Sequence, residues 1–182
     1  MVPDLEVAIM RYARDRGYPV PEIHDASGSD LVLERVDGEE MARDILGRPW
    51  RLRRHARTLA ELHRRLHAIA PPLWLRGDGN ELAHCDLHPR NVLLGSRGPM
   101  VIDWANARRA DGAFDVALSA IVTGGASLSA PLSLVRDLFV REFLRHFPRP
   151  EWEAAWDRAI AFRRADANVG DAERARLAHL RF

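Results

Sequence analysis

Three polar residues in the middle of this chain have the types and the spacing of a phosphoryl-transfer site. Asp86 is followed five positions later by Asn91 and seventeen positions later by Asp103. A loop carboxylate can orient an acceptor hydroxyl, and an amide oxygen with a second carboxylate can ligate Mg²⁺. The spacing therefore predicts that Asp86 is a base and that Asn91 and Asp103 are metal ligands.

Apolar elements around these residues must bring them together. The runs 92–94 and 100–102 predict two buried strands, joined by a hairpin connection over 95–99. Such a hairpin folds residue 103 back toward residue 91. Upstream, a helix is predicted from about 49 to 69, ended by two prolines. Its apolar stripe repeats at three- and four-residue steps, which indicates one buried face: Leu52, Ala56, Leu59, Leu62, Leu66 and Ile69.

The remaining segments predict an α+β protein whose second half is mostly helical. Hydrophobic periodicity and turn residues mark each expected element. The expected elements are a helix at 5–16, strands at 22–26 and 31–36 around a turn at 27–30, a short helix at 39–46, a connecting segment at 73–83, and helices at about 114–122, 131–146, 150–165 and 171–181.

Composition limits the possible partners. The 182 residues carry a net charge of +1 and one cysteine, which favours a reducing compartment. No apolar run approaches the roughly 20 residues that span a bilayer, and the first residues do not resemble a signal peptide. Six arginines on the helix at 49–69 indicate either a nucleic-acid surface or a solvated face, and the low net charge favours the solvated face. We expect a cytoplasmic protein that binds neither nucleic acid nor membrane.

The motif residues resemble a known family. The runs HCDLHPRN at 84–91 and IDW at 102–104, followed by Asp115, resemble the aminoglycoside phosphotransferase and choline kinase-like family, a branch of the protein-kinase-like fold. The resemblance covers roughly residues 5–120. It implies that Asp86 is the catalytic base, that Asn91 and Asp103 hold Mg²⁺, and that Asp115 anchors the loop. It also implies ATP or another nucleoside triphosphate as the donor and a small-molecule hydroxyl as the acceptor.

The same resemblance predicts that the small, nucleotide-binding lobe of this fold is truncated in this chain. Residues 31–38 resemble its last strand and the hinge, so Glu34, Arg35 and Val36 are the expected nucleotide contacts. We expect a truncated small lobe at 1–36, with one helix and two strands, and a large, mostly helical lobe at 37–182. The family's Gly-rich loop has no room, because a complete small lobe needs roughly 55 residues. The phosphate-pairing lysine is also missing, because all 27 basic residues are arginine. Glu6 matches the glutamate that would pair with that lysine, or is an exposed ion-pairing residue.

Several alternatives remain open at this stage. The alternation of His84, Asp86 and His88 is typical of metal ligands, although the context of Asn91 favours histidines that fix the loop by hydrogen bonds. Cys85 stands where the family usually has glycine, and is either a packing thiol or a nucleophile.

Two functions follow. The first is an ATP- and Mg²⁺-dependent small-molecule phosphotransferase. The second is a non-catalytic binding module that self-associates as a homodimer, or is completed by a partner, through the open strand edge of the small lobe.

Overall fold

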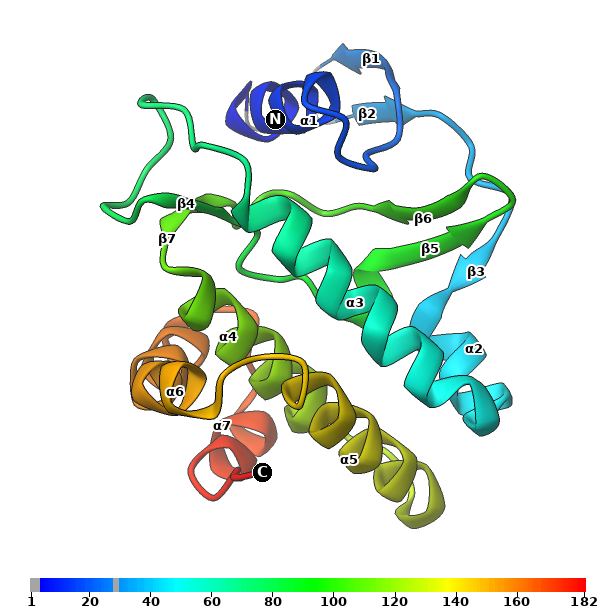
Figure 1. Cartoon of the computed structure of the whole chain (residues 1–182), viewed down its shortest axis with the longest axis vertical. Helices are drawn as coiled ribbons and strands as arrows, with labels where there is room; N and C mark the ends of the chain where they lie inside the picture. Colours follow the sequence, from blue (N-terminus) through cyan, green and yellow to red (C-terminus); the bar gives the residue numbers. More distant parts are fainter. Residues whose placement is uncertain (1–3, 28–29) are drawn as a thin grey trace.

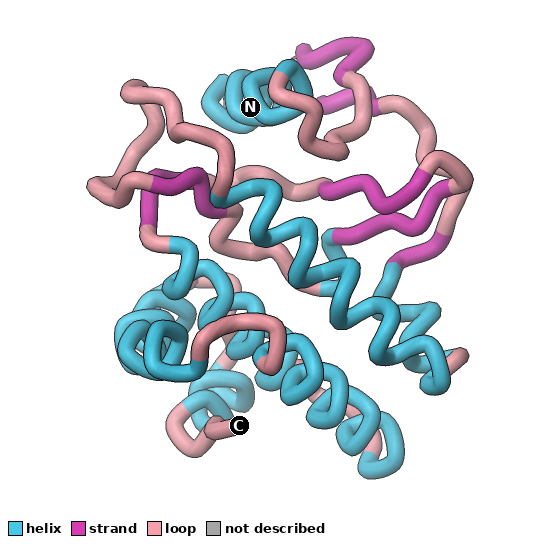
Figure 2. Tube along the Cα trace, in the orientation of Figure 1, coloured by secondary structure: helices cyan, strands magenta, loops and turns pink. Residues whose placement is uncertain are grey.

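The computed structural model describes residues 4–27 and 30–182. Small antiparallel sheets come from the first two thirds of the chain, and a layer of helices comes from the last third (Figure 1). The long helix α3 (Leu52–His67) lies between them, with the strands on one side and the C-terminal helices on the other (Figure 2). The predicted α+β class is confirmed.

The N-terminal elements form a separate layer above the other sheets (Figure 1). Helix α1 (Asp4–Asp15) ends before Gly17, whose φ of +76° suits glycine, and it buries Ile9, Met10 and Ala13. Strands β1 (Ile23–Ser27) and β2 (Asp30–Leu33) pair antiparallel. The prediction of a strand as far as residue 36 is wrong, because β2 ends at Leu33. The predicted turn at 27–30 includes residues 28–29, which lie outside the described residues.

A three-stranded sheet follows, in the order β3-β5-β6. It contains β3 (Glu39–Glu40), β5 (Val92–Gly95) and β6 (Gly98–Val101). The predicted hairpin is confirmed, with a shorter turn than expected. The short helix α2 (Met41–Gly47) begins two residues later than predicted, because Glu39 and Glu40 pair with β5. Gly38 permits this pairing, since a Cβ there would lie 2.0 Å from the Leu94 carbonyl oxygen.

The prediction for α3 is confirmed, preceded by a short 3₁₀ turn η1 (Pro49–Arg51). Ala56, Leu59, Leu62 and Leu66 are fully buried, as the stripe predicts. The six arginines are all exposed, and the prediction of a solvated face rather than a nucleic-acid surface stays a prediction. They are Arg51, Arg53, Arg54, Arg57, Arg64 and Arg65.

The segment expected to be a connection contains a strand that the sequence pattern does not reveal. Strand β4 (Glu81–Ala83) pairs antiparallel with β7 (Arg108–Ala110), with Leu82 opposite Arg109. Each strand has only three residues, too few to show alternation. This pair brings the start of the motif to the segment that follows Asp103.

The four C-terminal helices lie where they are predicted, although the last one is shorter. They are α4 (Gly112–Gly125), α5 (Ala130–Leu144), α6 (Arg149–Ala165) and α7 (Asp171–Leu177). Helix α4 is buried along most of its length and packs against both α5 and α6. None of the described helices combines the length and the apolar character needed to cross a bilayer.

Candidate active site

The residues 84–91, called here the motif loop, connect β4 to β5 and end in a 3₁₀ turn, η2 (Pro89–Asn91). The register of the β5–β6 hairpin places Val92 opposite Val101. The next residue, Ile102, donates its backbone N–H to the Asn91 carbonyl at 3.1 Å. Asp103 therefore begins beside Asn91, and the predicted return of the chain to the motif loop is confirmed.

Asn91 and Asp86 are in direct contact. The Asn91 Nδ2 atom donates to the Asp86 backbone carbonyl at 2.9 Å and stands 3.3 Å from the Asp86 Oδ2 atom. Both amide hydrogens are thus directed toward Asp86, and the Oδ1 atom of Asn91 remains as an acceptor. An amide oxygen is the kind of ligand that Mg²⁺ accepts.

Asp86 is a much weaker acid than an ordinary aspartate side chain. Burial, and then the negative charge of Asp103, raise the pKa of Asp86 to about 7, while the Arg163 guanidinium acts in the opposite direction. A group with a pKa near neutrality can accept a proton from a hydroxyl and release it again at physiological pH.

Asp103 is exposed and has a φ of +64°, a left-handed conformation that aspartate tolerates better than most residues. Glu6 on α1 holds the next residue, since the Trp104 backbone N–H donates to the Glu6 Oε1 atom at 3.1 Å. The Trp104 ring is buried and meets Tyr18 edge-on at 5.6 Å. Among the described residues Glu6 forms no ion pair. Its observed contact is the hydrogen bond to Trp104, which the sequence analysis did not predict and which anchors the segment after Asp103.

Asp115 holds the other end of the motif loop. Its buried carboxylate accepts the backbone N–H groups of His84 at 3.2 Å and Cys85 at 2.8 Å. Burial would raise the pKa of Asp115, yet His63 and His67 hold it well below its usual range. On the same helix, the Ser119 hydroxyl donates to the Leu87 carbonyl. Helix α4 therefore carries the motif loop through two side chains one turn apart.

The two motif histidines differ in their surroundings. His88 accepts the Arg90 backbone N–H at its Nδ1 atom, at 3.2 Å, and its Nε2 atom lies 3.5 Å from Asp86 Oδ1. His84 is fully buried, and its ring lies 4.7 Å from the Trp104 ring. The ring also interacts with the backbone of Ile102, the residue before Asp103, and its predicted role in fixing the loop stays a prediction. Burial lowers the pKa of His84 to about 4 and that of His88 to about 3.

The alternatives for this loop gain no support from its geometry. In the described part of the chain, His84, Asp86 and His88 do not converge as a metal-ligand group. Cys85 is only 3% exposed, and burial raises the pKa of its thiol well above the ordinary value, which leaves little nucleophilic thiolate.

The expected nucleotide contacts lie in the crossing between β2 and β3. Glu34 forms an ion pair with Arg97 in the β5–β6 turn, and its Oε2 atom accepts the Glu22 backbone N–H at 3.2 Å. Arg35 is exposed, and Val36 lies against Gly95. Within the described residues, no hydrogen bond or ion pair joins these three residues to the motif loop.

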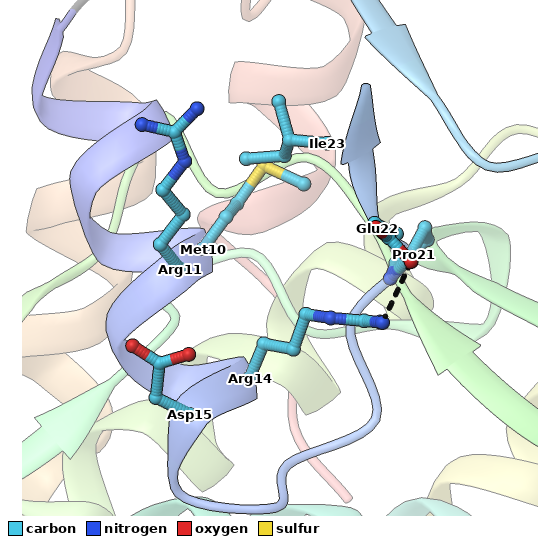
Figure 3. A pocket seen from close by; sticks show the side chains of 7 residues that line it. All are labelled: Met10, Arg11, Arg14, Asp15, Pro21, Glu22 and Ile23. Carbon is cyan, nitrogen blue, oxygen red and sulfur yellow. Dashed lines mark hydrogen bonds and ion pairs between the residues drawn. The ribbon is translucent and has the colours of Figure 1, made fainter. Parts of the chain in front are cut away.

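A small hollow of about 180 Å³ lies between α1 and β1, away from the motif loop. Figure 3 shows Arg14 crossing it to reach Glu22, at 3.1 Å, with Met10 and Ile23 on the apolar side. None of the predicted site residues lines this hollow.

Comparison with known proteins places the chain among phosphotransferases. Residues 4–83 and 65–159 match the sequence profile of the phosphotransferase enzyme family. A choline/ethanolamine kinase family protein from Mesorhizobium loti superposes with a TM-score of 0.60 and 15% identity, over 96% of this chain and 78% of that one. An ethanolamine kinase from Plasmodium vivax gives a TM-score of 0.48 and 11% identity, over 96% and 72%. No curated protein matches the chain in sequence. The first superposition shows a shared fold, and the predicted kinase-like fold is confirmed.

Proposed function

Because the chain belongs to the phosphotransferase enzyme family, we propose that it transfers a phosphoryl group from ATP, or another nucleoside triphosphate, to a hydroxyl of a small molecule. One observation carries the proposal. The Asn91 Nδ2 atom lies 3.3 Å from the Asp86 carboxylate, and the N–H of Ile102, the residue before Asp103, donates to the Asn91 carbonyl at 3.1 Å. Asp86 orients the acceptor hydroxyl and takes its proton as the phosphoryl group arrives.

Asn91 and Asp103 are the proposed Mg²⁺ ligands, and their surroundings fit that ion. The Asn91 Nδ2 atom is engaged by Asp86, which leaves Oδ1 as a donor oxygen. Asp103 forms no ion pair among the described residues, and its charge is strong enough to raise the pKa of Asp86. When bound, Mg²⁺ would neutralise charge on the phosphates and on the leaving group. Asp115 and Glu6 act as anchors, and His84 and His88 support the loop.

The nucleotide is proposed to meet Glu34, Arg35 and Val36 at the hinge, with residues 1–36 as the small lobe and 37–182 as the large lobe. The absence of lysine means that any protein cation near the phosphates is an arginine. Arg163 is one whose charge reaches both Asp86 and His88.

A coupled assay of ADP release tests the function, run with a panel of hydroxyl acceptors and with and without Mg²⁺. Asp86→Asn should lower turnover by about 10²–10⁴-fold, the usual contribution of a general base. Asp157→Asn is the matched control, since Asp157 is exposed and pairs only with Arg181 among the described residues. No transfer to any acceptor, together with no Mg²⁺-dependent stabilisation by ATP, would reject the proposal.

A non-catalytic module is the second candidate. The N-terminal sheet has two strands among the described residues, and Val32 on β2 is 48% exposed. An open edge of this kind can pair with another strand. This candidate requires a homodimer or a partner complex by analytical ultracentrifugation and no turnover. Measurable phosphoryl transfer by a monomer would exclude it.

A further inference from the structure

A cluster of two histidines and one carboxylate lies behind the motif loop, outside the proposed Mg²⁺ site. His63 and His67 stand one turn apart on α3 and face Asp115 on α4. The His67 Nε2 atom is 3.0 Å from Asp115 Oδ2, and the His63 Nδ1 atom is 3.4 Å from the same oxygen. All three ligand atoms lie within 4.8 Å of one another.

The two distances from the histidine nitrogens to Asp115 Oδ2 are close to those between ligands of a tetrahedral metal site. Ligand atoms at about 2.0–2.1 Å from Zn²⁺ stand about 3.3–3.4 Å apart. Two histidines at positions i and i+4 of a helix are a common source of two such ligands. Small adjustments of the side chains would therefore complete three of the four ligands.

The charges at this cluster also favour a cation. Asp115 is fully buried, accepts two backbone N–H groups and faces both histidines, and no arginine forms an ion pair with it among the described residues. His63 is fully buried as well, and neither of its ring nitrogens makes a well-formed hydrogen bond in the described structure. Buried charges are normally paired or bound to metals, and an unpaired buried polar atom costs about 1–3 kcal/mol.

Of the three residues, only His67 connects the cluster to the surface. His67 has a side chain that is 10% exposed, and it lines a surface hollow of about 450 Å³. Glu81 and Glu151 lie on the wall of the same hollow and would attract a divalent cation.

We propose that His63, His67 and Asp115 bind a transition-metal ion of the Zn²⁺ class, which locks the motif loop in place through the Asp115 carboxylate. The ion has a structural role, because Asp115 already holds the backbone N–H groups of His84 and Cys85. This site is independent of phosphoryl transfer, so that its existence and the proposed function stand or fall separately.

Titration with Zn²⁺ alone, followed by calorimetry and thermal unfolding, tests the site. The wild-type protein should bind one equivalent and unfold at a higher temperature. His67→Ala should weaken binding by at least about 100-fold, since loss of an outer partner alone costs about 10–100-fold. His24→Ala, which removes an exposed histidine, should bind like the wild type, and so should Asp103→Asn in the proposed Mg²⁺ site.

Co²⁺ provides a readout that does not depend on any variant. The wild-type protein should show the strong visible bands of a tetrahedral ion, and Zn²⁺ should displace them. Absence of stoichiometric binding, or equal binding by His67→Ala, would overturn the proposal and leave a hydrogen-bonded anchor in its place.

Discussion

Cys85 offers a test of how the motif loop is built, because its backbone conformation favours glycine while its buried position favours a side chain. Its φ of +62° lies in the left-handed region, which costs an ordinary residue about 1–2 kcal/mol. Its thiol is nevertheless buried in the core, beside the carboxylate that accepts its N–H. A substitution therefore changes strain and burial together, and the balance can be worked out.

Cys85→Gly relieves about 1–2 kcal/mol of strain but loses about 0.5–1 kcal/mol in backbone entropy. It also loses the burial of a small side chain, about 1–1.5 kcal/mol at roughly 0.8 kcal/mol per buried carbon. These effects largely cancel, so the free energy of unfolding should fall by about 0.5 kcal/mol, and by no more than about 1.5 kcal/mol. Cys85→Val retains the strain in a β-branched residue and overfills the site, so it should lose about 3 kcal/mol or more.

Urea unfolding measures both changes, as shifts of the midpoint at constant slope. Ala83→Gly is the matched control, since Ala83 is equally buried but does not have a positive φ. The same glycine should cost about 1.5–2 kcal/mol there, from entropy and a lost methyl group. If Cys85→Gly cost as much as Ala83→Gly, or if Cys85→Val were harmless, the strain argument would be wrong.

Three further predictions concern the anchors of the motif loop. Asp115→Ala leaves the buried N–H groups of His84 and Cys85 unpaired and should lower the free energy of unfolding by about 3–5 kcal/mol in urea titrations. Burial keeps His84 neutral in the folded state, with a pKa of about 4 against 6.5 in the unfolded chain. Its contribution to stability is therefore complete above pH 6.5 and falls by roughly 3 kcal/mol as the pH drops toward 4. His84→Phe should flatten that part of the measured curve of stability against pH. Glu6→Ala should cost about 1 kcal/mol and weaken Mg²⁺-dependent stabilisation by ATP in a thermal-shift assay, whereas Glu6→Gln, which still accepts the Trp104 N–H, should retain both.

The sequence predicted those parts of the fold that local patterns determine. The long apolar stripe of α3 and the turn residues between β5 and β6 depend on neighbours within a few positions, and both elements were located correctly. Strands β4 and β7 pair across more than twenty residues and are three residues long. Their pairing depends on tertiary contacts, so no local pattern could reveal it.

The site was predicted in the same uneven way. The return of the chain from Asn91 to the residue before Asp103 followed from one hairpin and is confirmed, whereas the roles of Asp86, Asn91 and Asp103 stay predictions. The contact between Glu6 and Trp104 joins residues 98 positions apart, so no local pattern could predict it. Glu6 was singled out only because it matches the glutamate that pairs with the family's lysine, which this chain lacks. His67 gave no signal, because a histidine on a helix rich in arginine is expected to be solvated.

The negative charge around Asp86 and Asp103, together with the absence of lysine, affects the order in which the proposed Mg²⁺ and nucleotide would bind. Asp103 raises the pKa of both Asp86 and Glu6, which means that these carboxylates repel one another in the absence of a cation. In the proposed function a nucleoside triphosphate would add further negative charge there, and the chain offers Arg163, but no lysine, to compensate it. Since like charges at short distance cost more in a partly buried site than in water, we expect the proposed Mg²⁺ to enter with or before the nucleotide. Nucleotide binding should therefore depend on Mg²⁺ more steeply here than in a site with a phosphate-pairing lysine, and the thermal shift by ATP with and without Mg²⁺ measures that dependence directly.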